Sequence, residues 1–208
     1  MDRFYFIPFG CSLVAHGLLH ELGHPHHPVL LQPGSDGLGD AAFAALSPGR
    51  TVPVLDGDSG RFTQSTQILL HLAQLYPAAR LLPEDADARR EALDLLGFVT
   101  ADVHPSFRPL LRPDRFVQQP DAQRELRERA TERLSGQLQV LEQRLAQRDY
   151  LAGDQLGLAG PYVLVFSLWS KHVGLDYPEK LGDLAQRVAA RPGYQRAIAI
   201  EQAARQAA

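Results

Sequence analysis

Cys11, the only cysteine in the chain, has side-chain chemistry that depends strongly on its surroundings. It follows a short apolar run over residues 4–7 and precedes a segment with helical spacing, which predicts a position at a helix N-terminus. The positive end of the helix dipole and the unpaired N–H groups there favour a thiolate over a thiol. A buried structural cysteine is the alternative, because cysteine also packs as a small hydrophobe. The position alone leaves both interpretations open.

Val52-Pro53 and Gln64-Ser65 are two further candidates for ligand binding. Proline cannot donate a backbone hydrogen bond to a sheet, so Pro53 is expected at an edge or in a cis turn that frees the backbone of the preceding residue. Gln64-Ser65 precedes a helical pattern and can offer an amide, a hydroxyl and helix N-terminal N–H groups to a carboxylate. Ser65 is expected to cap that helix at the same time.

A histidine-rich segment contains an apparent zinc-protease motif. Residues 20–24 read His-Glu-Leu-Gly-His, and the motif requires both imidazoles on one helix face. Gly23 within the motif and Pro25 after it predict that the helix ends before His24, so the two imidazoles would not share a face. No metal site is predicted, although short histidine-rich tracts can bind metal adventitiously. The histidines after the helix are expected in a solvated loop: His24, His26 and His27.

The elements that would position these residues form two halves. Residues 1–76 read as β-α-β, a short helix and then β-β-α, a compact α/β layer structure; residues 77–86 read as a linker, and residues 87–208 as a wholly helical region. Short apolar runs bounded by turn residues are expected as strands: 4–7, 27–32, 51–55 and 61–63. Segments with helical spacing are expected as helices: 12–22, 40–46, from 65 onward, 87–112, 121–148, 159–173, 180–190 and 193–206.

Composition places the chain among ordinary globular proteins. Of its 208 residues, 45% are hydrophobic and 22% are charged, which excludes wholesale disorder and fibrous repeats. No stretch reaches the ~18 uncharged apolar residues of a membrane span, and the N-terminus lacks the features of an export signal. A net charge of -3 argues against nucleic-acid binding. One cysteine makes no intramolecular disulfide and fits a reducing cytoplasm, so a cytoplasmic location is expected.

The order of these features resembles the cytosolic glutathione transferases, and within that family the bacterial beta class. The resemblance covers essentially the whole chain and implies a thioredoxin-like N-terminal domain followed by an all-helical C-terminal domain. The matching stretches, in order, are Cys11-Ser12-Leu13, residues 47–55, residues 61–65, residues 149–154, Trp169 and residues 189–192.

Glutathione-binding positions follow from the resemblance. It implies that Val52, before a cis Pro53, pairs its backbone with the cysteinyl part of glutathione. Gln64 and Ser65 would hold the γ-glutamyl end, and Thr51 would also contact the tripeptide. Gln64 stands where the class usually has an acidic residue. Two other positions depart from the class pattern, where a tyrosine and a lysine are usual: Phe6 and Pro105.

Catalytic positions are also implied by the resemblance. Cys11 would face the glutathione sulfur and could form a mixed disulfide with it, and Ser12 would offer a hydroxyl nearby. His104 matches the active-site histidine of the class. The side chains expected to line the pocket for an apolar co-substrate are Phe9, Phe107, Leu111 and Trp169.

The implied function is conjugation of glutathione, as co-substrate, to a small hydrophobic electrophile. The resemblance implies a homodimer with no permanently bound cofactor, no nucleic-acid partner and no membrane association. Two alternatives stay open: glutathione-dependent thiol–disulfide exchange at Cys11, and a non-catalytic binding protein on the same fold. Replacing Cys11 by alanine would abolish exchange but leave much of a conjugation activity, which separates the two enzymatic interpretations.

Overall fold

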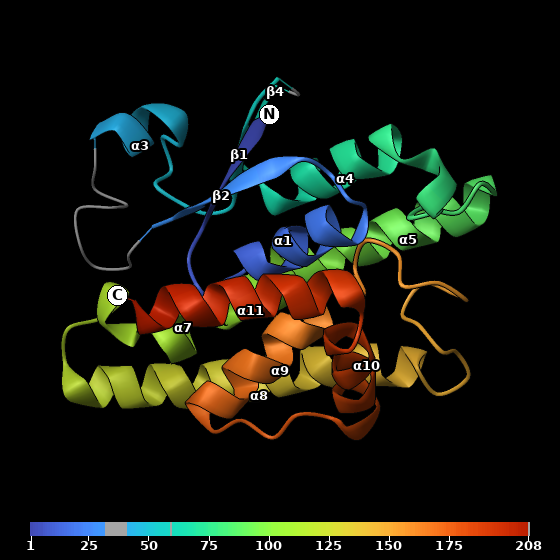
Figure 1. Ribbon diagram of the computed structural model, residues 1–208. Helices are drawn as coiled ribbons and strands as arrows, with labels where there is room; N and C mark the ends of the chain where they lie inside the picture. Colours follow the sequence, from blue (N-terminus) through green and yellow to red (C-terminus); the bar gives the residue numbers. More distant parts are fainter. Residues whose placement is uncertain (32–40, 59, 208) are drawn as a thin grey trace. The chain divides into compact units, whose positions relative to one another are not determined.

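The computed structural model describes residues 1–31, 41–58 and 60–207 (Figure 1). Two compact units make up the chain. The first consists of Met1–Arg80 together with Arg187–Ala208, and the second is Leu81–Gln186. This division differs from the boundaries expected at residues 76 and 87, because the last helix packs on the first helix of the chain and so belongs to the first unit.

A four-stranded sheet with the order β2-β1-β3-β4 forms the centre of the first unit. β2 runs parallel to β1, as the helical crossover between them permits, whereas β3 is antiparallel to both β1 and β4. The expected strands are confirmed with small shifts in their ends. The third begins after Pro53, which has no N–H to donate to the sheet. The strands are β1 Asp2–Phe6, β2 His26–Leu30, β3 Val54–Gly57 and β4 Gly60–Phe62.

Four α-helices and a short 3₁₀ turn complete the described part of the first unit. This β-α-β and β-β-α order confirms the expected thioredoxin-like fold. Residue 40 at the start of the expected 40–46 helix, the loop before that helix and residue 32 at the end of the expected 27–32 strand lie outside the described residues. The helices are α1 Ser12–Glu21, α3 Ala41–Leu46, α4 Ser65–Leu75, η1 Pro77–Ala79 and α11 Pro192–Gln206.

Two glycines allow α11 to approach α1 closely (Figure 1). A Cβ added at Gly17 would lie 2.2 Å from the ring of Tyr194, and one added at Gly193 would lie 2.3 Å from the backbone nitrogen of Glu21. Glu21 also accepts the Gly193 N–H at 2.8 Å. Any larger side chain at either glycine would therefore separate the two helices.

Every regular element of the second unit is a helix. Asp85 caps α5 by accepting the Ala88 N–H at 2.9 Å, and Pro120 begins the longest helix, where its missing N–H costs nothing. No helix in the described residues is long and apolar enough to cross a membrane. The elements are α5 Ala86–Phe98, η2 Val99–Val103, α6 His104–Ser106, α7 Arg108–Leu111, η3 Pro113–Arg115, α8 Pro120–Arg144, α9 Tyr162–Val173 and α10 Glu179–Ala189, whose last residues extend into the first unit.

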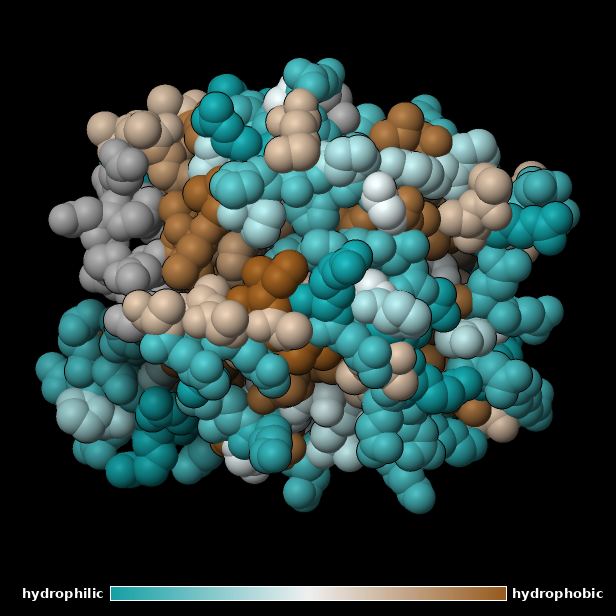
Figure 2. All heavy atoms as spheres, viewed as in Figure 1, coloured by the Kyte–Doolittle hydropathy of each residue, from teal (hydrophilic) through white to brown (hydrophobic). Residues whose placement is uncertain are grey.

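The helix expected over residues 87–112 is divided into several segments. η2 is a π-helical turn, and the His104 N–H bonds to the carbonyl of Val99, five residues earlier. Pro105 follows directly and has no N–H for the regular α-helical pattern, which accounts for the irregularity at this point. Figure 2 shows a largely hydrophilic surface where Figure 1 places α8, consistent with a helix that buries only one narrow face.

Candidate functional site

Cys11 lies in the turn between β1 and α1. It is the N-cap residue of α1, as the sequence predicts, and its partly buried side chain is a thiol that forms no disulfide. The thiol donates a hydrogen bond to the carbonyl of Val52 at 3.3 Å. This contact joins two of the predicted glutathione-binding positions within the first unit.

The peptide bond between Val52 and Pro53 is cis. Ser47 anchors the residue before this pair, since its buried hydroxyl accepts the Thr51 N–H at 3.3 Å and donates to the Thr51 carbonyl at 3.1 Å. Thr51 itself is exposed. Sequence reasoning overlooked this role of Ser47, whose position just before Pro48 is the only sequence signal for it.

Ser12 has its hydroxyl turned into the protein. The side chain is fully buried, accepts the Ile7 N–H at 3.3 Å and donates to the Ile7 carbonyl at 3.1 Å. These two bonds close the turn between β1 and α1. The neighbouring Cys11 thiol is therefore the more accessible of the two side chains.

The N-terminus of α4 differs from the sequence expectation by one residue. Gln64 is the N-cap, in an extended conformation, and Ser65 is the first helical residue, so the prediction that Ser65 caps the helix is wrong. The exposed Gln64 side chain makes no capping hydrogen bond. The first turn of this helix can therefore present N–H groups to an anion.

Phe9 holds the middle of the β1–α1 turn in an unusual conformation. Its φ angle of 57° lies in the left-handed region that non-glycine residues rarely adopt. Glu201 of α11 accepts the Phe9 N–H at 2.6 Å, and the Arg205 guanidinium lies 5.9 Å from the centre of the Phe9 ring. Residues of α11 thus anchor the turn that carries Cys11.

A buried acid–base pair continues from this anchor. The other carboxyl oxygen of Glu201 lies 2.8 Å from Nδ1 of His16, and both side chains are fully buried. Burial raises the pKa of Glu201 to about 8 and lowers the pKa of His16 to about 4, so both groups favour their neutral forms.

The apparent HExxH motif is divided as predicted, because α1 ends at Glu21 and Gly23 adopts a left-handed φ of 64°. The expectation of a solvated loop after it is wrong for His24 and His26 and holds for His27 only in its exposure. His24 is buried between Asp2 and Tyr76, with a ring nitrogen 3.0 Å from each, and His26 and His27 are the first two residues of β2. The Asp2 carboxylate gives His24 a hydrogen-bonding partner, which offsets the cost of burying its polar ring.

In the second unit, His104 belongs to an aromatic cluster. Its ring stacks on Trp169 with 5.4 Å between centres, and burial lowers its pKa to about 4. Phe107 packs edge-on against Trp169 and stacks on Phe166. Phe107 packs against Trp169 but has no exposed surface. It therefore has no face open to a co-substrate, contrary to its expected place in the pocket lining.

Leu111 lines a pocket of the second unit. The pocket has a volume of about 930 Å³. Its wall is mixed rather than purely apolar, because α8 contributes Arg124, Arg127 and Glu128 beside Leu110 and Leu111. A co-substrate bound here would meet charge as well as hydrocarbon.

Comparison with known proteins extends these observations. Two family models match the sequence: "Glutathione S-transferase, N-terminal domain" over residues 12–80 and "Glutathione S-transferase, C-terminal domain" over residues 100–192. The chain is 26% identical over 204 residues to "Glutathione S-transferase GstA" of Escherichia coli O157:H7, a match that covers 96% of this chain and 98% of that protein.

Solved structures give the same result. The bacterial beta class glutathione S-transferase of Sphingomonas chungbukensis superposes with a TM-score of 0.82 at 30% identity, covering 96% of this chain and 98% of the other. A sphingomonad glutathione S-transferase complexed with glutathione superposes with a TM-score of 0.81 at 31% identity and the same coverage. The similarity therefore extends over both units.

Proposed function

The chain belongs to the cytosolic glutathione S-transferase family and is similar to its bacterial beta class, and on this premise we propose that it conjugates reduced glutathione to small hydrophobic electrophiles. The observation that carries the proposal is the contact of the Cys11 thiol with the carbonyl of Val52, beside the cis Pro53. It joins a thiol at a helix N-terminus to the backbone that is expected to pair with the cysteinyl part of glutathione.

The proposed reaction needs only positioning and charge stabilisation. The glutathione thiol loses its proton to solvent, and its thiolate attacks the electrophilic carbon of the co-substrate. A C–S bond forms, and the leaving group departs with the electron pair of its bond to that carbon. Cys11 would turn its S–H from the Val52 carbonyl to the glutathione sulfur, while the bonds of Ser12 to Ile7 hold the shape of the turn.

Gln64 and Ser65 are proposed to hold the γ-glutamyl end. The uncapped first turn of α4 suits the glutamyl carboxylate, and the exposed Gln64 amide can accept a hydrogen bond from the amino group. A carboxylate at this position would strengthen that bond. We expect Gln64→Glu to tighten glutathione binding by up to about tenfold, because a carboxylate adds the attraction of opposite charges to the hydrogen bond with the ammonium group.

The matched control is Gln67→Glu, which adds the same charge to the same helix three residues further on, also at an exposed position. Isothermal titration of the two variants and the wild type with reduced glutathione separates a local effect from a general charge effect. Equal changes in both variants would contradict the assignment of Gln64.

The second unit is proposed to contribute to binding the apolar co-substrate. Trp169 offers a partly exposed aromatic surface, and Leu111 lines a pocket wall. His104 is neutral at pH 7, given its lowered pKa of about 4, and would assist the leaving group through a neutral N–H donor rather than as a cation. Phe9 of the first unit is the remaining aromatic side chain assigned to this role.

Thiol–disulfide exchange is the second candidate, favoured by the position of the reduced Cys11 at the start of α1. The Cys11 thiolate would attack the glutathionyl sulfur of a mixed disulfide; the S–S bond breaks, and the substrate thiolate leaves and takes up a proton. A glutathione thiolate would then attack the Cys11–glutathione disulfide, releasing oxidised glutathione and restoring the Cys11 thiolate.

One set of measurements tests both activities. Isothermal titration with reduced glutathione is combined with mass spectrometry for a reducible adduct at Cys11 after exposure to oxidised glutathione. We expect Cys11→Ala to lose the adduct and all exchange, and to retain conjugation of a chlorinated dinitrobenzene within about tenfold, because an S–H group is only a weak hydrogen-bond donor. Absence of glutathione binding at millimolar concentration would overturn both enzymatic proposals in favour of a binding protein.

A cytoplasmic homodimer is proposed as the working form, as is typical of the family. The chain mass is 22.9 kDa. Light scattering on the eluting peak of a size-exclusion column distinguishes this mass from twice that value.

A further inference from the structure

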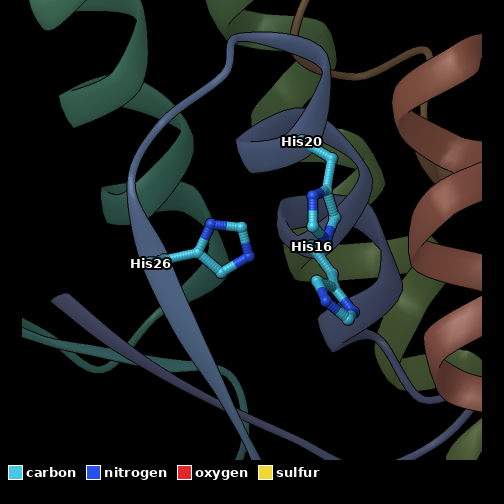
Figure 3. A group of neighbouring side chains, drawn as sticks. All are labelled: His16, His20 and His26. Carbon is cyan, nitrogen blue, oxygen red and sulfur yellow. The ribbon is translucent and has the colours of Figure 1, made fainter. Parts of the chain in front are cut away.

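Three histidines of the first unit lie together between α1 and the start of β2 (Figure 3). His16 and His20 are four residues apart on α1, so they share one face of the helix, and His26 projects towards that face from β2. One ring nitrogen of each lies within 4.8 Å of one from each of the others. Their ring centres are 4.6–5.9 Å apart.

Each of these rings has a buried nitrogen without a partner. The Nε2 atoms of His16, His20 and His26 are inaccessible to solvent and make no hydrogen bond among the described residues. The His16 side chain is fully buried. An unsatisfied buried polar atom is costly, and native structures contain few of them. Three at one place point to a common ligand.

The remaining ring nitrogens determine which atom is free to bind that ligand. Nδ1 of His26 lies 2.8 Å from the carbonyl of His24, which can only accept a hydrogen bond, so Nδ1 carries the proton and Nε2 a lone pair. Nδ1 of His16 lies 2.8 Å from the Glu201 carboxyl group, and when that group is ionised Nδ1 donates to it, which leaves a lone pair on Nε2. A histidine with one nitrogen bonded to a carbonyl or carboxylate is the usual form of a metal ligand.

We propose that His16, His20 and His26 form a binding site for a divalent transition-metal ion, Zn²⁺ in first place, with their three Nε2 atoms as ligands and water in the fourth position. Glu201 is the positioning residue, because it orients His16 without touching the ion. Three imidazoles favour zinc, copper or nickel over Mg²⁺ or Ca²⁺, which prefer oxygen ligands.

The geometry is within reach of a tetrahedral site. Nitrogens about 2.0–2.1 Å from zinc are ~3.3 Å apart at the tetrahedral angle, so rotations that move the ring nitrogens by ~1 Å close the present separations. His20 and His26 are only partly buried, which leaves a route for an ion to enter.

Electrostatics are compatible with such an ion. Arg196 disfavours added positive charge near His20, whereas Asp2 favours it near His26. A cation on the far nitrogen of His16 would also stabilise the ionised form of Glu201.

The test uses the full chain without a histidine tag, freed of metal by a chelator. Zn²⁺ is titrated in competition with a chromophoric chelator, and Co²⁺ is added separately for its visible absorption. We expect one Zn²⁺ per chain, a rise in Tm on binding, and a Co²⁺ spectrum of four- or five-coordinate type. Uptake of less than half an equivalent of Zn²⁺ at micromolar concentration by the folded wild type would overturn the proposal.

The variants are chosen so that folding and metal binding can be separated. His20→Gln and His26→Gln change partly buried rings, and each is expected to weaken Zn²⁺ binding at least 100-fold while the circular dichroism spectrum is retained. His27→Gln is the matched control, because the exposed His27 follows His26 in β2 and its side chain points to the opposite face. Wild-type affinity in His20→Gln, or equal losses in His27→Gln, would contradict the assignment.

Glu201→Gln tests the positioning role separately. It keeps an oxygen that can accept from His16 but removes the charge, and we expect ~10–100-fold weaker Zn²⁺ binding at unchanged 1:1 stoichiometry. Unchanged affinity would remove Glu201 from the site.

Discussion

Buried polar groups are distributed very unequally between the two units. Of the buried polar or charged side chains among the described residues, Ser170 alone lies in the second unit. The others are in the first unit: Asp2, Ser12, His16, His24, Ser47 and Glu201. The interior of the second unit consists instead of leucines, valines and rings such as Phe107 and Phe166, and its charges pair at the surface.

This difference reflects what each unit has to hold in place. In the first unit, buried bonds fix short irregular segments: Ser12 closes the β1–α1 turn, Ser47 anchors Thr51, and Glu201 holds the strained Phe9. The second unit is built mainly of helices, and apolar packing is sufficient to hold these in place. Directional bonds therefore occur where the backbone keeps an irregular shape.

The largest expected effect comes from a pair of glutamates that each make two hydrogen bonds. Glu201 is buried, accepts from the Phe9 N–H and is bonded to His16, whereas Glu91 is partly exposed and accepts from Arg144 and Arg148. We expect Glu201→Met to lower the free energy of unfolding by about 2–5 kcal/mol, because it leaves the buried polar groups of Phe9 and His16 without this partner.

The corresponding Glu91→Met change is expected to cost less than about 1 kcal/mol, and 1 M salt should remove most of that cost. Denaturant titration followed by circular dichroism measures both variants. Similar losses for the two glutamates would show that burial does not distinguish the units in the way described.

A pair of helical glycines gives the next largest effect. Gly17→Ala places a methyl group against the Tyr194 ring, and we expect a loss of about 1–3 kcal/mol from overpacking. Gly136 lies within α8 with no heavy atom within 4 Å of an added Cβ. Gly136→Ala should raise stability by ~0.5–1 kcal/mol through helix propensity alone. If both substitutions stabilise the protein, α1 and α11 are less tightly packed than the structure indicates.

The smallest expected effect concerns His104, a partly buried titratable group of the second unit. Its folded-state pKa of about 4 lies below the ordinary value of 6.5, so the unfolded chain binds the proton more readily. Stability from this group is complete above pH 6.5 and is lost as the pH falls towards 4. Between pH 7 and pH 5 the loss should be roughly 1–2 kcal/mol.

His104→Phe keeps an aromatic ring beside Trp169 and removes the titration. The difference in unfolding free energy between pH 7 and pH 5 should therefore shrink by that amount relative to the wild type. An unchanged pH dependence would mean that the His104 ring is protonated without cost in the folded protein.

Local sequence patterns were sufficient for most elements of the fold. Apolar periodicity and the positions of proline and glycine located α8, α9 and α11 within a few residues, and the cis geometry of Pro53 was among the expected alternatives. The turn with Cys11 at the start of α1 was also predictable, because strand, turn and helix signals follow one another directly.

Contacts between distant residues could not be predicted in this way. His16 and His20 are one helical turn apart, a visible signal, but only the pairing of β2 with β1 brings His26 to them. Glu201 lies 185 residues from His16, and no local pattern marks it as the partner. The membership of α11 in the first unit has the same cause, since it depends on the fit of Gly17 to Tyr194.

The joining of α11 to α1 has a consequence for synthesis on the ribosome. The hydrogen bond between Glu21 and Gly193 joins residues 172 positions apart, and at ~5–20 residues per second the ribosome needs roughly 10–30 s to cover that distance. During this interval the nascent first unit lacks the helix that covers Gly17 and anchors Phe9. The second unit is continuous in sequence and can be completed earlier. The emerging chain would therefore expose one face of α1 to chaperones until the C-terminal helix leaves the exit tunnel.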